Sequence, residues 1–174
     1  MKNQRLELFL EQRKIAERVA QLAQNISADY QDKDLVLVCV LKGAFFFFVD
    51  LIRRLTVTPL IDFVAASSYH RQGSMGRVSL SPVFSTSIRG RDVLIIEDII
   101  DTGLTYRTLT NYFSLREPAS LRLCTLLDKP SERRTELIQP DYVGFVVPDR
   151  FLVGYGLDCD ERYRELPDIH ILTT

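Results

Sequence analysis

The sequence has few of the residues that build zinc sites and disulfide frameworks. It contains two histidines and three cysteines, and the cysteines lie far apart without a C-x-x-C pair: Cys39, Cys124 and Cys159. A zinc site is therefore not expected. The odd number of cysteines fits a reducing compartment better than a set of disulfides, so we expect a cytoplasmic protein.

The sequence also lacks a clear excess of positive over negative residues, or of negative over positive ones. The chain has 22 Lys and Arg against 23 Asp and Glu, a formal net charge of -1. No basic face therefore argues for binding nucleic acid or an anionic membrane surface. Charges are spread through the N-terminal stretch MKNQRLELFLEQRKIAERVA, which leaves no apolar run long enough for a signal peptide or a membrane span. Any phosphate chemistry must be local.

The chain does have enough apolar residues for one core. At 174 residues and 46% hydrophobic, it is expected to form a single domain, residues 1–174. Apolar residues at helical spacing predict an amphipathic helix from Leu6 to about Asp29. Farther on, apolar runs alternate with helical patterns, which predicts strands at 34–41, 59–67, 80–86, 93–96 and 120–128 and helices at 42–55 and 105–115. This order is typical of an α/β fold with a central parallel sheet flanked by helices.

The stretch VLIIEDIIDTGLT, Val93 to Thr105, combines an apolar strand with an acidic loop. Ligands of parallel α/β sheets bind outside the carboxyl ends of the strands, where this loop must lie. Gly103 can adopt a positive φ angle, Thr102 and Thr105 add hydroxyl donors, and a helix beginning near Leu104 turns its positive end toward the loop. The stretch therefore predicts a cradle for a phosphate monoester.

Glu97 and Asp98 stand just before this cradle. Carboxylates repel a phosphate unless they accept hydrogen bonds from sugar hydroxyls or hold a magnesium ion beside it. A sugar phosphate with its metal is therefore predicted. The simpler alternative is an acidic cluster that only complements a helix dipole. Three carboxylates, two threonines and a glycine within nine residues are more than one helix N-cap requires.

The stretch VLIIEDIIDTGLT resembles the phosphoribosyl-pyrophosphate signature of the type I phosphoribosyltransferases, in their 6-oxopurine branch. Other segments resemble the same branch in the same order. LVCVLKGAFFFFVDLIRRL resembles its L-K-G loop and helix, SSYHRQGSMG its mobile loop, and LLDKPSERR its lysine segment. PDYVGFVVPDRFLVGYGLDCDERYRELPDI resembles its base-binding hood and acidic loop. The matches run from about Asp34 to Ile169 and imply a small hood built from the chain termini.

The resemblance implies transfer of a phosphoribosyl group from phosphoribosyl pyrophosphate to N9 of hypoxanthine or guanine, with Mg²⁺ as cofactor. It makes Asp101 the general base that faces purine N7, a role typically worth ~10²–10⁴-fold in rate. It also implies that Glu97 and Asp98 hold the ribose hydroxyls and a magnesium ion. The 5′-phosphate would rest on residues 101–105, that is Asp101, Thr102, Gly103, Leu104 and Thr105.

Recognition of the purine is carried over in the same way. Lys129 would donate to the O6 carbonyl, and an aminopurine would leave its ammonium unpaired, which disfavours adenine. Phe151 would stack on the ring and the backbone of Leu152 would read its edge. Hypoxanthine, guanine and xanthine differ at position 2, which backbone carbonyls near Asp158 would read. Without the resemblance, Phe151 would be interpreted as a core aromatic and Lys129 as a solvated turn residue.

The resemblance implies that pyrophosphate is held by two segments, one at residues 42–43 and one that contains Arg164. Lys42 and Gly43, at the end of a strand, can bring their backbone close to it. Arg164 would pair with its oxygens in a fork-like geometry, and Asp158 would complete a second magnesium site. Taken alone, Asp158 could be a turn residue and Arg164 a solvated surface residue.

The segment 68–78 has the composition of a mobile loop. The resemblance makes Ser68 and Tyr69 part of a lid that keeps water from the activated ribose. The alternative is a disordered loop with an incidental tyrosine.

Four consecutive phenylalanines, Phe45 to Phe48, cannot face one side of a helix, because each residue turns it by about 100°. The helix is either buried all round within one subunit or packed against a second copy. We favour the second copy, and the resemblance also implies a homodimer or homotetramer.

Two other functions would require some of the same residues. A phosphoribosyltransferase fold that only senses a nucleotide and regulates nucleic acid should lose the catalytic residues and gain a basic face. Here Asp101, Lys129, Asp158 and Arg164 are present and the net charge is -1. A phosphotransferase built on an aspartyl phosphate would also want a carboxylate at a strand end with magnesium, but it leaves the lysine and hood segments unexplained.

Overall fold

The computed structural model describes residues 4–69, 77–82, 85–130, 132, 134 and 138–173, and at 67–69, 77, 78 and 82 it describes the backbone alone. In chain order the elements are β1 (Arg5–Leu10), α1 (Gln12–Asp29), β2 (Leu35–Leu41), α2 (Phe45–Ile52), β3 (Leu60–Tyr69), β4 (Arg77–Pro82), β5 (Asp92–Ile100), α3 (Leu104–Ser114), β6 (Ser120–Asp128), β7 (Tyr142–Val146), β8 (Leu152–Val153) and β9 (Ile169–Thr173).

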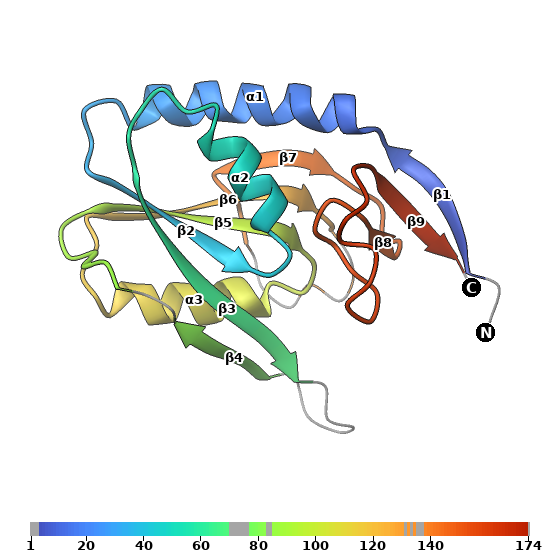
Figure 1. Ribbon diagram of the computed structural model, residues 1–174. Helices are drawn as coiled ribbons and strands as arrows, with labels where there is room; N and C mark the ends of the chain where they lie inside the picture. Colours follow the sequence, from blue (N-terminus) through green and yellow to red (C-terminus); the bar gives the residue numbers. More distant parts are fainter. Residues whose placement is uncertain are drawn as a thin grey trace.

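The main sheet has six strands in the order β4-β3-β2-β5-β6-β7. Five of these strands run parallel, as the alternating strand and helix pattern predicts: β3, β2, β5, β6 and β7. The edge strand β4 pairs with β3 in the antiparallel direction. The helices α1 and α2 cover one face of this sheet and α3 covers the other (Figure 1). The predicted α/β fold with flanking helices is confirmed, as a mixed sheet.

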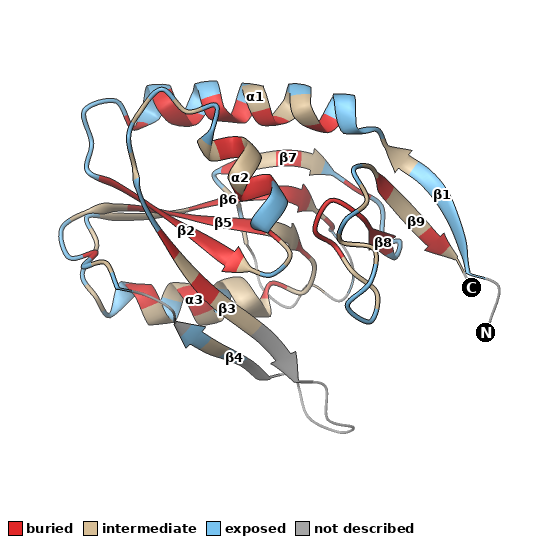
Figure 2. Ribbon diagram, in the orientation of Figure 1, coloured by how far each residue is buried: buried red, intermediate tan, exposed pale blue. Residues whose placement is uncertain are grey.

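Both faces of the central strand β2 are buried. Its odd-numbered residues, Leu35, Leu37 and Cys39, pack into the core under α1 and α2, and Val36 and Val38 pack into the core on the α3 side. The side chains alternate because successive residues of a strand point to opposite faces. A continuous apolar run is the pattern expected of a strand covered by helices on both faces (Figure 2).

The helix α2 carries the phenylalanine run. Phe47 and Phe48 are buried, whereas Phe45 and Phe46 are 46% and 40% exposed. Burial of each inner ring is worth roughly 1.5–3 kcal/mol. The helix is therefore not buried all round within this chain.

A second sheet, of order β1-β9-β8, brings the two ends of the chain together beside the carboxyl ends of the main strands (Figure 1). This is the predicted hood. The expected hood segment also included residues 142–146, but these form β7 at the edge of the main sheet.

The prediction of one helix from Leu6 was wrong at its start. Leu6 and Leu8 belong to β1, where they pair with Leu172 and His170 of β9, and the helix begins at Gln12. Their spacing of two residues is the period of a strand. Two residues at this spacing indicate a strand only once the partner strand β9, from the other end of the chain, is known.

Other boundaries differ from the prediction as well. β4 ends at Pro82, not at 86, and the N–H groups of Ser85 and Thr86 donate to the buried Asp62 carboxylate at 3.0 and 2.8 Å. β5 continues to Ile100, not to 96, so Glu97 and Asp98 lie inside the strand. Within the described residues, no helix is both long enough and apolar enough to span a membrane.

Candidate active site

The acidic loop follows β5 and leads into α3. Gly103 caps this helix with a φ of 85°, a left-handed conformation that favours glycine. The Leu104 N–H donates to Thr102 Oγ1 at 3.4 Å, and the first turn of the helix contains no acidic residue. The first N–H groups of a helix have no partner inside it, so they and the positive end of α3 could receive an anion, which is the geometry that the predicted phosphate cradle requires.

Glu97 and Asp98 occupy the end of β5. Among the described residues, Glu97 Oε2 is buried without a hydrogen-bond partner. Burial, and then the charge of Asp98, raise the pKa of Glu97 well above its usual range. Burial also raises the pKa of Asp98 to about 6, although the Ile99 N–H, which donates to Asp98 Oδ1 at 2.8 Å, acts in the opposite direction. A cation or hydroxyl donor at this point would stabilise both charged forms.

Three segments meet around the end of β2. A Cβ atom at Gly43 would overlap the carboxylate of Asp98, and one at Gly156 would overlap the carbonyl oxygen of Gly43. The peptide bond between Leu41 and Lys42 is cis. The close approaches at Gly43 and Gly156 show that the turn after β2 is packed between β5 and the loop that follows β8.

Lys129 lies directly after β6 and reaches across to the acidic loop. Its ammonium is 2.9 Å from Asp101 Oδ2 and 3.7 Å from Asp149 Oδ1, and the residue is only 7% exposed. Its backbone N–H donates to the Ile100 carbonyl at 3.0 Å. The alternative of a solvated turn residue is wrong, because Lys129 is buried and paired with the carboxylate predicted to act as the base.

Arg134 was not singled out in the sequence, although it lies in the LLDKPSERR segment. Its guanidinium forms an ion pair with Asp128 and donates to the carbonyls of Ile100 at 3.1 Å and Asp101 at 3.4 Å. The contacts tie the segment after β6 to the end of β5. The sequence reasoning also did not single out Asp149, the second partner of Lys129. Asp149 lies in the PDR stretch directly before Phe151, which is the sequence feature that could have pointed to it.

Phe151 and Leu152 lie at the start of the hood. Phe151 is 54% exposed, and its carbonyl accepts a hydrogen bond from the Leu172 N–H at 2.9 Å. Leu152 is buried and begins β8. Phe151 is therefore not a core aromatic, because about half of its surface is exposed.

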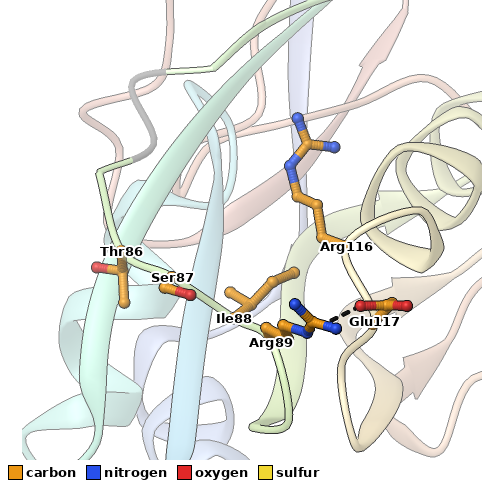
Figure 3. Close-up of a pocket in the computed structure, with 6 residues that line it drawn as sticks. All are labelled: Thr86, Ser87, Ile88, Arg89, Arg116 and Glu117. Atoms are coloured by element: carbon orange, nitrogen blue, oxygen red, sulfur yellow. Dashed lines mark ion pairs between the residues drawn. The ribbon is translucent and has the colours of Figure 1, made fainter.

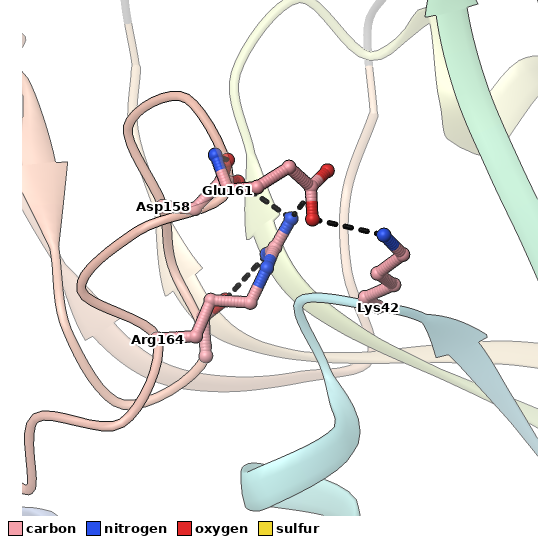
Figure 4. Close-up of polar contacts among 5 residues, drawn as sticks. Lys42, Asp158, Glu161 and Arg164 are labelled. Carbon is pink, nitrogen blue, oxygen red and sulfur yellow. Dashed lines mark hydrogen bonds and ion pairs between the residues drawn. The ribbon is translucent and has the colours of Figure 1, made fainter.

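The loop after β8 carries a chain of ion pairs (Figure 4). Arg164 Nη2 lies 2.8 Å from Asp158 Oδ1 and 3.5 Å from Glu161 Oε1, while Lys42 Nζ lies 2.8 Å from Glu161 Oε2. Arg164 Nη1 also donates to the Gly156 carbonyl at 2.7 Å. The structure thus brings Lys42 and Arg164, which were predicted for pyrophosphate, close to Asp158, which was predicted for magnesium. It also adds Glu161, which the sequence reasoning did not single out.

Ser68 and Tyr69 form the end of β3 in the backbone, opposite Val78 and Arg77 of β4. The prediction that a loop begins at Ser68 was therefore wrong by two residues. The lid role concerns their side chains and residues 70–76, which lie outside the described part of the structure.

The described residues contain no group of three or more His, Cys, Asp or Glu that could hold a metal ion by themselves. Magnesium is commonly bound through one or two carboxylates together with substrate phosphates and water. The unpartnered Glu97 Oε2 and the raised pKa of Asp98 fit such a ligand set.

A hollow of about 360 Å³ lies elsewhere, lined by Thr86, Ser87, Ile88, Arg89, Arg116 and Glu117 (Figure 3). These residues precede β5 and β6, so the hollow is at the amino ends of the strands. The length of β5 puts roughly 25 Å between it and the acidic loop. None of the predicted site residues lines it.

Comparison with known proteins gives one consistent result. Residues 6–160 match the phosphoribosyl transferase domain family. The hypoxanthine-guanine-xanthine phosphoribosyltransferase of Tritrichomonas foetus is 44% identical over 158 residues, covering 91% of this chain and 86% of its own. The hypoxanthine phosphoribosyltransferase of Escherichia coli K12 is 45% identical over 167 residues, covering 94% and 93%.

A crystal structure of a hypoxanthine-guanine phosphoribosyltransferase from Bacillus anthracis superposes with a TM-score of 0.90 at 42% identity, covering 99% of this chain and 100% of that one. The likeness extends over both sheets, because nearly the whole of each chain is matched.

Proposed function

Since this chain belongs to the phosphoribosyl transferase family, we propose that it is a purine salvage enzyme that transfers the 5-phosphoribosyl group of phosphoribosyl pyrophosphate to N9 of a 6-oxopurine. The products are a nucleoside monophosphate, IMP from hypoxanthine or GMP from guanine, and pyrophosphate. The relatives compared above are named for hypoxanthine alone, for hypoxanthine and guanine, and for these two with xanthine.

The observation that carries this proposal is the distance of 2.9 Å between Asp101 Oδ2 and Lys129 Nζ. N7 and O6 are neighbouring atoms on one edge of a 6-oxopurine. A lysine that donates to O6 and a carboxylate that accepts the proton of N7 must therefore stand side by side. The buried position of Lys129 also makes an unpaired ammonium costly, which acts against adenine.

In the reaction, the bond between N9 and C1 of the ribose forms while the bond from C1 to pyrophosphate breaks. Asp101 takes the proton that N7 loses, and Lys129 holds O6. Phe151 stacks on the ring, the backbone of Leu152 reads the purine edge, and carbonyls near Asp158 face position 2.

The phosphoribosyl group lies between the acidic strand end and α3. The N–H groups of residues 101–105 and the positive end of the helix bind the 5′-phosphate. Glu97 and Asp98 accept hydrogen bonds from the ribose hydroxyls. Bound Mg²⁺, held by these carboxylates and by Asp158, would neutralise charge on the pyrophosphate as it leaves.

Pyrophosphate itself meets the backbone of Lys42 and Gly43, the Lys42 ammonium and the guanidinium of Arg164. Ser68 and Tyr69 close over the ribose and exclude water. The side chains of Arg164 and Asp158 are already paired at 2.8 Å, which supports a preformed site rather than one assembled by the substrate.

We also propose that the enzyme is a cytoplasmic homodimer or homotetramer working as one domain per chain. The exposed rings of Phe45 and Phe46 support a contact with a second copy, because side chains of this size are rarely left in water. All three cysteines are free, which supports a reducing compartment. Changing both rings to serine should shift the molar mass measured by light scattering toward the monomer.

A spectrophotometric assay with phosphoribosyl pyrophosphate and magnesium tests the reaction, with hypoxanthine, guanine, xanthine and adenine offered separately. Turnover of at least one 6-oxopurine, with little or none of adenine, is the expected result. Absence of turnover with every base, in protein that still binds phosphoribosyl pyrophosphate, would refute the proposal and favour a binding module.

A further inference from the structure

Lys42 and Arg164, the two cations assigned to pyrophosphate, both contact one carboxylate that this assignment does not use. Glu161 Oε2 lies 2.8 Å from Lys42 Nζ, and Glu161 Oε1 lies 3.5 Å from Arg164 Nη2 (Figure 4). Each oxygen of the carboxylate therefore faces a different cation, as two oxygens of a phosphate group would.

The backbone holds Glu161 in this position independently of its carboxylate. The φ angles of Asp160 and Glu161 are 52° and 62°, in the left-handed region. Cys159 and Arg162 exchange two backbone hydrogen bonds of 3.1 Å, and the Glu161 N–H donates to Asp158 Oδ2 at 2.9 Å. A change confined to the side-chain charge of Glu161 should therefore leave the turn intact.

The contact with Lys42 is accessible and weak. The side chains of Lys42 and Glu161 are 68% and 64% exposed, and exposed ion pairs contribute little because water and salt screen them. The Lys42 ammonium, and then Arg164, lower the pKa of Glu161, so the carboxylate is charged at neutral pH. Among the described residues, Arg164 Nε is buried without a partner, which leaves one donor for an incoming anion.

We propose that Glu161 is a built-in competitor of pyrophosphate: it holds Lys42 and Arg164 in the empty site, is displaced when a pyrophosphate group binds, and returns as that group leaves. The inference rests on the proposed function and deepens it. Its consequence is that Glu161 weakens the binding of phosphoribosyl pyrophosphate and of product pyrophosphate alike, and so assists product release.

The test compares Glu161→Gln with the unmodified protein. Calorimetric titration with magnesium pyrophosphate, without any purine, should show roughly two- to five-fold tighter binding by the variant at low salt. The inhibition constant of pyrophosphate in the assay should fall by a similar factor. Both differences should shrink at high salt, because the contact is exposed.

Glu165→Gln is the matched control, because Glu165 is an exposed glutamate of the same loop. It removes the same charge and should leave pyrophosphate binding unchanged. In a Lys42→Gln background, the gain from Glu161→Gln should be smaller, since one of the two contested cations is gone.

Several outcomes would overturn the inference. Equal or weaker pyrophosphate binding by Glu161→Gln, or the same gain in Glu165→Gln, would show that Glu161 does not compete. The titration needs no turnover, so protein that binds pyrophosphate but converts no purine would refute the proposed function separately. Unmodified protein that binds no pyrophosphate would refute both.

Discussion

Replacing Lys129 with glutamine should narrow the preference for hypoxanthine over adenine. The ammonium is buried, and it is fixed between Asp101 and Asp149 at 2.9 and 3.7 Å. A hydrogen bond from a charged donor contributes about 1.5–3 kcal/mol. Since each 1.4 kcal/mol is a factor of ten, kcat/KM for hypoxanthine should fall roughly 10- to 100-fold.

Adenine should respond differently to the same change. The glutamine amide can turn its carbonyl oxygen toward the 6-amino group, whereas the lysine ammonium can only donate. The value of kcat/KM for adenine should therefore stay level or rise. The ratio of kcat/KM for hypoxanthine to kcat/KM for adenine should fall by at least about tenfold. A buried ammonium that meets the 6-amino group of adenine, and so has no acceptor, is the larger part of the discrimination.

The assay measures kcat/KM for each base at saturating phosphoribosyl pyrophosphate, with thermal unfolding to confirm that the variant is folded. Lys33→Gln is the control, because Lys33 is an exposed lysine that lies over the Tyr30 ring, away from the acidic loop. An unchanged ratio in Lys129→Gln, or an equal change in Lys33→Gln, would refute the role of Lys129 in reading O6.

Three further predictions concern single residues. Asp101→Asn should lower kcat about 10²–10⁴-fold and change the Kd of phosphoribosyl pyrophosphate far less; equal losses would count against a general base. Gly156→Ala should lower the free energy of unfolding by more than about 2 kcal/mol, because a Cβ at its φ of 102° would overlap the Gly43 carbonyl; denaturant titration with little change would contradict this. Burial acts to raise the pKa of Asp62, but hydrogen bonds from backbone N–H groups outweigh it and lower the pKa. Its contribution is therefore complete above a pH of about 4 and lost as the pH falls further; Asp62→Asn should remove about 1–3 kcal/mol at neutral pH and flatten the acid limb of the stability curve, and an unchanged acid limb would oppose it.

The elements that depend on local pattern could be read from the sequence. The strand 120–128, the valine-rich β2 and the helix starting at Leu104 all lie where periodicity and composition place them. The predicted boundaries were wrong where they depend on a contact with a residue far away in the chain. Leu6 and Leu8 read as part of a helix, because nothing near them in the chain reveals the pairing with β9.

The candidate site divides in the same way. The predicted phosphate cradle is local in the chain, since one strand end, a glycine with positive φ and a helix N-terminus lie within nine residues. Its position and composition therefore emerge from the sequence. The neighbouring sequence could not decide whether Lys129 is a solvated turn residue or Phe151 a core aromatic. Lys129 is buried and Phe151 is exposed because of how the whole sheet and the hood pack together.

By itself, then, the sequence determined the order of strands and helices, the position of the acidic loop after β5 and the likeness to one enzyme family, all of which are encoded in short stretches. Only the tertiary structure decided which charges meet. Lys42 and Glu161 are 119 residues apart, and Lys129 reaches Asp101 from the neighbouring strand. Such contacts arise because parallel strands deliver their carboxyl ends, and the hood delivers both chain ends, to one edge of the sheet.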